Sequence, residues 1–200
     1  MARLGDIQIP RELLQKAAHG DEAAQVVVYT TTAPATFALI RRLMSNRAVA
    51  EDLFQDTMMT LFEKLPEFRG EAPLGAWLKQ IAVSKCLMFL RSPWHRVRLR
   101  LENESEPEIA QGLGALITPA PCVEGLDVER ALSSLSATAR AVVWLYEVEG
   151  YSHEEIARLF GRTVSFSKSQ LARAHVKLRD WFGSTRGKQS CTPIQSNGKV

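Results

Sequence analysis

Six lysines and arginines between positions 156 and 179 are the side chains best suited to bind an anionic polymer. The same stretch contains no aspartate or glutamate. Cationic groups bind phosphate oxygens, and an arginine can also donate two parallel hydrogen bonds to the edge of a guanine. The six are Arg158, Arg162, Lys168, Arg173, Lys177 and Arg179. The chemistry that this stretch predicts is recognition of nucleic acid.

Two helices joined by a short turn are needed to position these cations. Ser152 and Glu155 have the spacing of a capping box, and Gly161 has the residue type that commonly ends a helix. A second helix is expected from about residue 164. Its inner side would carry Val164, Ser167, Leu171, Ala174, Leu178 and Phe182. Its outer side would carry Ser165, Ser169, Arg173 and Lys177. This pattern is typical of a DNA-reading helix-turn-helix, and the alternative is a helical hairpin with a solvated basic face.

The composition of the whole chain excludes several other classes of protein. The 200 residues are 46% hydrophobic and carry a formal charge of +3, so one domain or two small ones are expected. We expect no membrane span, no signal peptide and a cytoplasmic location. Three dispersed cysteines and four dispersed histidines predict neither a disulfide framework nor a metal site. With no nucleophile–base set or phosphate loop visible, we expect no catalytic residues, no cofactor and no enzyme activity.

Helical patterns dominate the first 64 residues. Helices are expected over 11–19 and 21–32, followed by a break or restart at Pro34 and a further helix to about residue 44. The β-branched residues of 26–32 also allow a strand, but the helical flanks favour helix. The next helix, over 47–64, has an outer face of Asp52, Gln55, Asp56, Met59 and Glu63. That face is either a partner surface or an ordinary solvated one.

A second basic tract follows a loop over residues 65–73. The helix expected over 74–91 has Leu74, Trp77, Leu78, Ile81 and Met88 on its inner side and Gln80, Ser84, Leu87 and Arg91 on a second stripe. Cations accumulate between residues 71 and 102 without any acid. Cations beside aromatic rings suit single-stranded nucleic acid, although core packing is the alternative for Trp77.

The chain is predicted to be all-α, with two small helical domains joined by a flexible linker. The first domain covers residues 1–92 and the linker residues 93–125, of which 102–125 are acidic and aperiodic. The second domain, 126–183, would contain helices over 127–135 and 139–147 and then the helix-turn-helix. Residues 184–200 are polar and are predicted to form a disordered tail.

Three segments together resemble one family. They are AEDLFQDT at 50–57, GAWLKQIA at 75–82 and VEGYSHEEIARLFGRTVSFSKSQLARAHVKLR at 148–179. In order and spacing they are similar to the extracytoplasmic-function (ECF, group 4) sigma factors of the sigma-70 family. The resemblance runs from about residue 21 to 182, and it identifies the C-terminal motif as a winged-helix-like sigma region 4.

The resemblance implies a promoter-recognition subunit of RNA polymerase, whose partners are promoter DNA and core polymerase. Its acidic helix would bind the β′ coiled coil through Glu51, Asp52, Gln55 and Asp56. The melted −10 element would be held by Phe68, Arg69, Lys79, Gln80, Ser84, Lys85 and Arg91. The −35 element would be held by Arg162, Ser165, Phe166, Lys168, Ser169, Arg173 and Lys177. The β flap and an anti-sigma factor are further partners that the family implies, without a metal or a membrane.

The chain departs from the family pattern in the helix over 74–91 and in the segment 165–170, which reads SFSKSQ where the family usually has GTVKSR. The family commonly has Asn at Ser84, and Asp or Asn at Met88, while Ser167 replaces a core valine and Phe166 a small polar residue. Phe166 is expected to point away from the core, where it would meet a thymine methyl or fold back over the first helix. The rival function is that of a free-standing helix-turn-helix regulator, which would give no role to the acidic helix.

Overall fold

A computed structural model describes residues 3–92 and 123–189, and within these ranges the chain is helical and contains no strand. The first range holds η1 (Leu4–Asp6), α1 (Arg11–Ala18), α2 (Glu22–Leu43), α3 (Arg47–Lys64), η2 (Leu65–Glu67) and α4 (Leu74–Arg91). The second holds α6 (Val123–Ser133), α7 (Ala137–Val143), the π-helical turn η3 (Trp144–Val148), α8 (His153–Phe160) and α9 (Val164–Gln189). The predicted all-α class is confirmed.

The N-terminal domain packs α1, α3 and α4 around α2. Side chains such as Ile40, Leu61 and Leu78 have no solvent exposure, so burial of apolar surface is the main stabilising contribution. Two of the helices begin at side-chain caps. Asp21 accepts a hydrogen bond from the backbone N–H of Ala24, and Asn46 caps α3 in the same way. These caps fix where α2 and α3 begin.

Helix α2 continues through Pro34, contrary to the predicted break. Proline at position 34 cannot donate the hydrogen bond that would go to the carbonyl of Thr30. The threonine hydroxyls of the preceding turn donate hydrogen bonds to backbone carbonyls one turn earlier, as Thr32 Oγ1 does to Val28 O at 2.8 Å. Apolar residues on both sides of Pro34, including Val28 and Leu39, are buried in the same core. Tertiary packing therefore keeps one helix where local preference predicts two.

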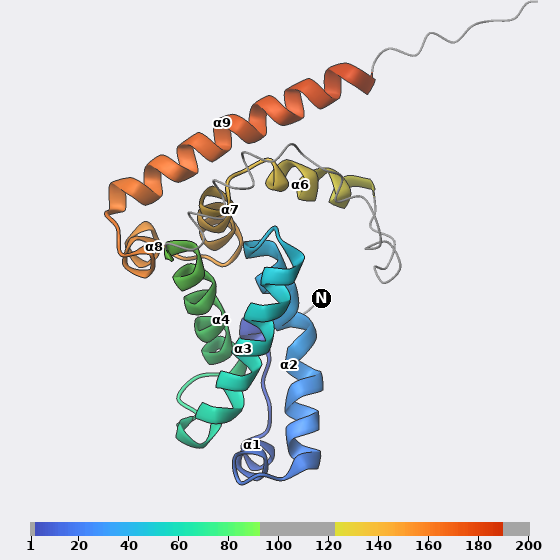
Figure 1. Cartoon of the computed structure of the whole chain (residues 1–200), viewed down its shortest axis with the longest axis vertical. Helices are drawn as coiled ribbons and strands as arrows, with labels where there is room; N and C mark the ends of the chain where they lie inside the picture. The colour runs from blue at the N-terminus through green and yellow to red at the C-terminus, as the bar shows by residue number, and fades with distance from the viewer. Residues whose placement is uncertain (1–2, 93–122, 190–200) are drawn as a thin grey trace, which may run out of the picture.

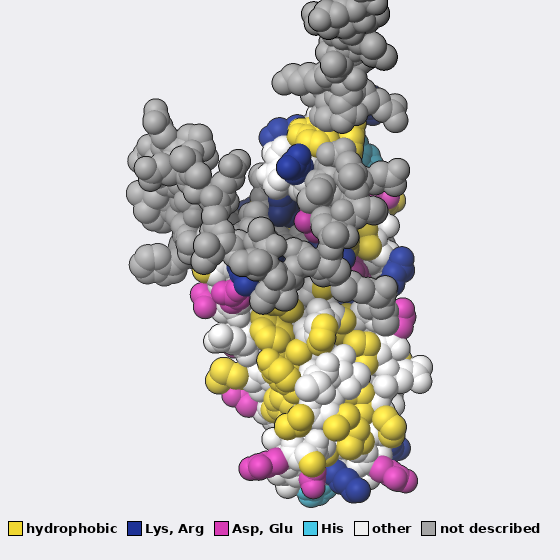
Figure 2. All heavy atoms as spheres, turned by 90° about the vertical axis from the view of Figure 1, so that its right-hand side faces the viewer, with side chains coloured by type: hydrophobic (Ala, Val, Ile, Leu, Met, Phe, Trp, Pro, Cys, Tyr) yellow, Lys and Arg dark blue, Asp and Glu magenta, His cyan; other side chains and the backbone are white. Residues whose placement is uncertain are grey.

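By length and composition α2 is the one helix of the described ranges that could cross a membrane, whereas no such helix was expected from the sequence. Its inner side belongs to the core, however, and core helices pass the same test. Its outer side leaves Val26, Val27 and Tyr29 exposed. Figure 2 shows apolar side chains gathered on this flank of the N-terminal domain.

The N-terminal segment lies tightly along α4. The backbone N–H of Gly75 donates to Ile7 O at 3.0 Å, and a Cβ at Gly75 would stand 1.9 Å from Leu4 O. A side chain at position 75 would therefore push η1 away from α4. The glycine allows the segment 4–7 to pack against the first turns of α4.

The C-terminal domain differs from its prediction at both ends. Helix α6 begins at Val123, inside the predicted linker, and residues 93–122 lie outside the described ranges. Helix α9 continues to Gln189, so residues 184–189 are helical and not part of a disordered tail; residues 190–200 are again outside the description. The aromatic and apolar pattern before position 183 predicted only the part of α9 that packs on other helices. Figure 1 shows α9 as a long helix at the end of the molecule opposite α1.

Contacts between the two domains are made by α4 with α8 and by α2 with α7. Figure 1 shows α8 beside the end of α4 that is farther from α1. The sequence predicted two domains joined by a linker and said nothing of the contacts between them.

Candidate nucleic-acid and polymerase interfaces

The outer face of α9 is open, as the periodicity predicted. Lys168, Ser169 and Arg173 are exposed, while Leu171 and Ala174 on the inner side are buried. Residues 156–179 contain no aspartate or glutamate. The exposed side chains predicted to contact the −35 element on α9 are Ser165, Lys168, Ser169, Arg173 and Lys177. Together they form what we call the α9 surface.

The predicted capping box fixes the start of α8. Glu155 N–H donates to Ser152 Oγ at 3.2 Å, and Ser152 N–H donates to Glu155 Oε2 at 2.8 Å. The hydrogen bond that the Ser152 backbone N–H donates to the carboxylate, together with one from the Ser152 side chain, lowers the pKa of the Glu155 carboxyl. At the other end Gly161 has φ +60°, the left-handed conformation that suits glycine, and exposed Arg162 follows it in the turn. The helix-turn-helix geometry is therefore confirmed.

Phe166 folds back over the first helix of the motif. Its ring centroid lies 5.6 Å from that of Phe160, and the side chain is half-buried. Of the two alternatives left by the sequence, this is the one in which Phe166 covers α8. Its apolar surface is already in contact with protein, so a thymine methyl would meet only the remaining part of the ring.

Ser167 is a buried polar residue with a partner that sequence reasoning missed. Its hydroxyl lies 3.0 Å from His153 Nδ1, and the imidazole stacks on Tyr146 at a centroid distance of 4.4 Å. A serine where the family carries a core valine was the signal that a buried partner is needed. The histidine one residue after the cap supplies it.

Two residues of the α9 surface also bond to nearby backbone. Lys177 Nζ donates to Ser134 O at 2.9 Å, and Arg173 Nε donates to Ser169 O at 3.2 Å. Both side chains remain exposed, so their charge still faces solvent. Lys177 is thereby held at the edge of the surface, next to the end of α6.

The acidic face of α3 is also exposed. Asp52, Gln55, Asp56, Met59 and Glu63 are all open to solvent, which agrees with the predicted outer face. Glu51 lies beside them in an ion pair with Arg47 at 2.7 Å. The face thus combines carboxylates with an exposed methionine.

Lys85, predicted to contact the −10 element, is paired with this acidic face. Its ammonium lies 2.7 Å from Asp56 Oδ2, with side-chain exposures of 20% for Lys85 and 58% for Asp56. The ion pair joins α4 to α3. Two residues assigned by sequence to different ligands therefore bind each other in the free chain.

Helix α4 presents a stripe that differs in two residues from its prediction. Gln80, Ser84 and Arg91 are exposed as expected, but Met88 is exposed and Leu87 is buried, the reverse of the prediction. The buried side of the helix carries Leu78, Ala82, Val83 and Cys86. Leu87 lies closer to that side, and hydrophobic pattern alone could not choose between two adjacent apolar residues. Met88 therefore extends the exposed stripe of Gln80 and Ser84.

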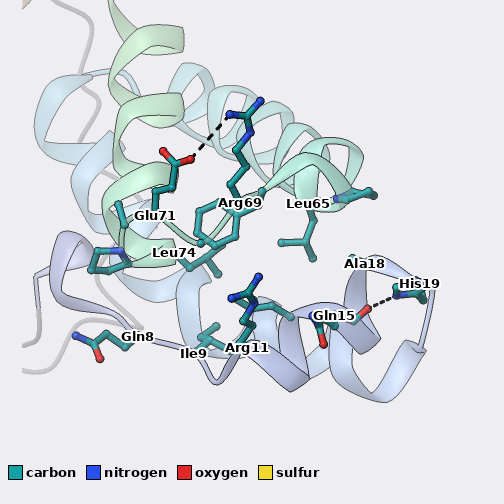
Figure 3. A pocket seen from close by; sticks show the side chains of 16 residues that line it. Gln8, Ile9, Arg11, Gln15, Ala18, His19, Leu65, Arg69, Glu71 and Leu74 are labelled. Atoms are coloured by element: carbon teal, nitrogen blue, oxygen red, sulfur yellow. Dashed lines mark hydrogen bonds and ion pairs between the residues drawn. The ribbon is translucent and has the colours of Figure 1, made fainter.

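A pocket of about 720 Å³ lies between α1 and the loop that precedes α4. Figure 3 shows Arg11 and Gln15 from α1 on one wall and Arg69 and Glu71 from the loop on the other. Arg69 lies 3.9 Å from Glu71, and both side chains are largely exposed. Phe68 also lines the pocket, and its ring packs on Trp77 at a centroid distance of 5.0 Å. The volume falls in the range of about 300–1,000 Å³ that is usual for small-ligand pockets.

Lys79 lies on a different side of α4 from the exposed stripe. Its ammonium is 3.3 Å from Glu149 Oε2 and 5.4 Å from the ring centroid of Tyr151, both in the C-terminal domain. Arg91 also reaches that domain, where its Nη1 donates to Leu159 O at 3.3 Å. The predicted −10 residues are therefore not brought together on one free surface.

Cysteine and metal chemistry have no site in the described residues. Burial raises the pKa of the Cys86 thiol to about 12, so it stays protonated at neutral pH. The part of the chain that the structure describes holds no group of three or more His, Cys, Asp or Glu side chains that could bind a metal ion.

The fold and these surfaces define a two-domain helical protein with a DNA-reading motif, and comparison with known proteins gives its family. Residues 28–96 match the model of sigma-70 region 2, and residues 125–178 match that of sigma-70 region 4. The chain belongs to the sigma-70 family, and its relatives place it among the extracytoplasmic-function sigma factors. Members of this family are transcription initiation factors and not enzymes.

Three similar proteins illustrate the match. The ECF sigma factor SigE of Mycolicibacterium smegmatis is 29% identical over 82% of this chain and 65% of its own length. SigM of Mycobacterium tuberculosis is 28% identical over 86% of this chain and 84% of its own. The sigma factor RpoE of Bartonella quintana, solved with the anti-sigma factor NepR, has a TM-score of 0.53 at 29% identity, covering 78% of this chain and 94% of that one. The chain spans less than half, 42%, of another relative, the probable sigma factor RfaY of Xanthomonas campestris pv. campestris.

Proposed function

We propose that this protein binds core RNA polymerase in the cytoplasm and directs it to promoters that carry specific −10 and −35 elements. The observation that carries the proposal is that one chain exposes both an acidic face on α3 and a cationic reading face on α9. A DNA-binding protein acting alone needs the second face but not the first. A subunit that attaches polymerase to DNA needs both.

The α9 surface would enter the major groove of the −35 element. Arg173 lies in its middle and suits a bidentate contact with a base edge, whereas Arg162, in the turn before α9, and Lys177, at the other end, suit phosphates. Phosphate contacts give affinity that depends on salt but not on sequence. Base contacts give the selection between promoters.

The exposed stripe of α4 and the loop before it would hold the melted strand of the −10 element. Gln80 and Ser84 offer exposed side-chain hydrogen-bonding groups that have no partner among the described residues, and Arg69 offers an exposed cation. The pocket beside Phe68 and Arg69 would take a base that has left the stack, because it offers both an aromatic edge and polar groups. Lys79, Lys85 and Arg91 would join this surface when their present protein partners release them.

The acidic face of α3 would bind the β′ coiled coil of polymerase, and the C-terminal domain would meet the β flap. The exposed apolar residues Val26, Val27 and Tyr29 on α2 support a protein partner on the N-terminal domain, because patches of this kind mark interaction sites. An anti-sigma protein is a further proposed partner, supported by the complex of the Bartonella quintana sigma factor with NepR.

The test is initiation by core polymerase from the source organism. Polymerase mixed with this protein should transcribe from promoters selected out of a random library, and polymerase alone should not. Asp52→Arg should abolish most of this activity because it reverses charge in the middle of the acidic face, while Glu12→Arg on α1 makes the same charge change away from it. Promoter-specific DNA binding without any stimulation of initiation would instead favour the free-standing regulator.

A further inference from the structure

We infer that a pocket between α2 and η3 binds a small carboxylic acid with an aliphatic tail, that is, a medium-chain fatty acid. The pocket has a volume of about 390 Å³. This lies in the range of about 300–1,000 Å³ that is usual for small-ligand sites, which often occur where two domains meet. Besides α2, the pocket is lined by Arg3, Leu4, Ile7, Trp144, Val148 and Glu149. We call it the α2–η3 pocket.

One side of α2 forms the long wall of this pocket. Six residues line it in two rows at a spacing of four, with Thr31, Ala35 and Leu39 in one row and Pro34, Ala38 and Arg42 in the other. At 1.5 Å per residue the wall from Thr31 to Arg42 is roughly 16 Å long. The alanines in its middle have short side chains and leave space in front of the helix. An extended chain can follow such a wall over its whole length.

The side chains around this space are mainly aliphatic. Leu4 and Leu39 belong to the buried core, while Ile7 and Val148 are half-buried. Such side chains offer no hydrogen bonds, and each methylene group that a ligand buries against them raises its affinity by about fourfold. The indole of Trp144 adds apolar surface, and its N–H is already bound to Glu149 Oε1 at 3.2 Å. The part of a ligand that enters the pocket is therefore an apolar tail.

Two arginines give the pocket its preference for an anion. Arg3 and Arg42 are both exposed, and neither forms an ion pair with a described residue. The guanidinium carbon of Arg42 lies 5.0 Å from the ring centroid of Trp144, a contact that leaves the positive charge without a counter-charge. A guanidinium can donate two parallel hydrogen bonds to a carboxylate. The head of the ligand would bind Arg42 at one end of the α2 wall, with Arg3 as a second cation at the same pocket.

Glu149 is the one acidic residue among those that line the pocket, and its charge is already compensated. Its Oε2 lies 3.3 Å from Lys79 Nζ, and its Oε1 accepts the hydrogen bond from Trp144. Only 12% of the side chain is exposed. The charges left for a ligand are those of Arg3 and Arg42. They favour a carboxylate over an alcohol or an amine with the same tail.

Titration calorimetry of the full chain with unbranched fatty acids tests the site. Decanoate should bind about 15-fold more tightly than octanoate, because it buries two more methylene groups. Octanoate should bind about tenfold more tightly than 1-octanol, which has the same tail without the charge, and octylamine should bind no better than the alcohol. Equal affinities for the two acids, or an alcohol or amine that binds as well as octanoate, would overturn the inference.

A variant that fills the pocket locates the tail. Ala38→Leu adds an aliphatic side chain in the middle of the α2 wall and should lower the affinity for decanoate by at least about tenfold, since it occupies space that the tail needs. Ala48→Leu makes the same change at an exposed position of α3 and should leave binding unchanged. Decanoate binding that is equal in Ala38→Leu and in the parent would show that the tail lies elsewhere and that the inference is wrong.

A second variant locates the head and separates binding from damage to the fold. Arg42→Gln should lower the affinity for octanoate by about tenfold and leave that for 1-octanol unchanged, whereas a misfolded pocket would lose both ligands. Arg158→Gln removes an exposed arginine from α8 and should change neither affinity. If Arg42→Gln retains the full preference for the acid, Arg42 does not hold the carboxylate and the assignment of the pocket fails. These titrations contain no polymerase or DNA, so their outcome is independent of the proposed function.

Discussion

The α9 surface and the cations of α4 (Lys79, Lys85 and Arg91) both present lysine and arginine side chains on a helix, but these side chains have different partners. On α9 the outer side chains face solvent, and their polar contacts in the described residues are to neighbouring backbone. On α4 Lys85 is paired with Asp56, Lys79 with Glu149, and Arg91 with the carbonyl of Leu159. A basic stretch therefore identifies an available surface only where no acid from another element folds against it.

The largest effect that distinguishes the two surfaces is expected from Arg173→Ala. Loss of a bidentate base contact costs about 1–3 kcal/mol and relaxes selection at one base pair. Affinities for a panel of −35 duplexes, each changed at one position, should show reduced discrimination at a single position. Arg179→Ala removes an exposed cation from another side of the same helix and should not change selection. An equal loss on every duplex would assign Arg173 to the phosphates.

The core beneath the α9 surface gives the next effect. Ser167→Val is expected to stabilise the C-terminal domain by roughly 1 kcal/mol, because the gain from apolar burial exceeds the net value of one hydrogen bond. His153 is only half-buried, so its freed nitrogen can find water. Thermal unfolding of the full chain measures the change, with Ser169→Val as the control for a valine in the same helix at an exposed position. A lower melting temperature for Ser167→Val would mean that the His153 contact contributes more than the apolar gain.

These two regions also show what sequence could predict. Local signals were sufficient for the helix-turn-helix: the capping box, the glycine C-cap and the inner and outer sides of α9 all follow from residues within one or two turns of each other. Helix α4 was predicted with the correct bounds, Leu74–Arg91, for the same reason. The environment of its cations was not predictable, because Glu149 and Leu159 are 70 and 68 residues from their partners.

The errors have the same origin. One helix through Pro34 and the exchange of Leu87 with Met88 depend on packing against distant elements. The fold class needed only periodicity, whereas the state of each site residue needed the tertiary structure. For Phe166 the sequence left two alternatives, and the ring of Phe160, six residues earlier but on another helix, decides its position.

A smaller effect is expected at the edge of the α9 surface. Lys177→Ala should lower affinity by a similar factor for every −35 sequence and reduce the slope of log affinity against log salt by about one. The ammonium is anchored on Ser134 O, so it is already positioned and loses little entropy on binding phosphate. Titrations at two salt concentrations on a matched and a mismatched duplex measure both quantities. A change in the ratio between the two duplexes would place Lys177 among the base contacts.

The smallest effect is expected on α4, from Lys85→Ala. Because Lys85 holds Asp56 in the free chain and the carboxylate is more than half exposed, the pair should contribute less than about 1 kcal/mol to stability. Binding of the −10 strand by the free chain should also change little, since the ammonium is not available to phosphate. Arg69→Ala provides the comparison, because its guanidinium is largely exposed beside the pocket and its nearest acid is 3.9 Å away. Oligonucleotide affinities of the two variants in the free chain should differ, with the greater loss for Arg69→Ala. An equal loss would show that strand binding displaces Asp56 readily, and that the engaged cations of α4 are as available to DNA as the open ones of α9.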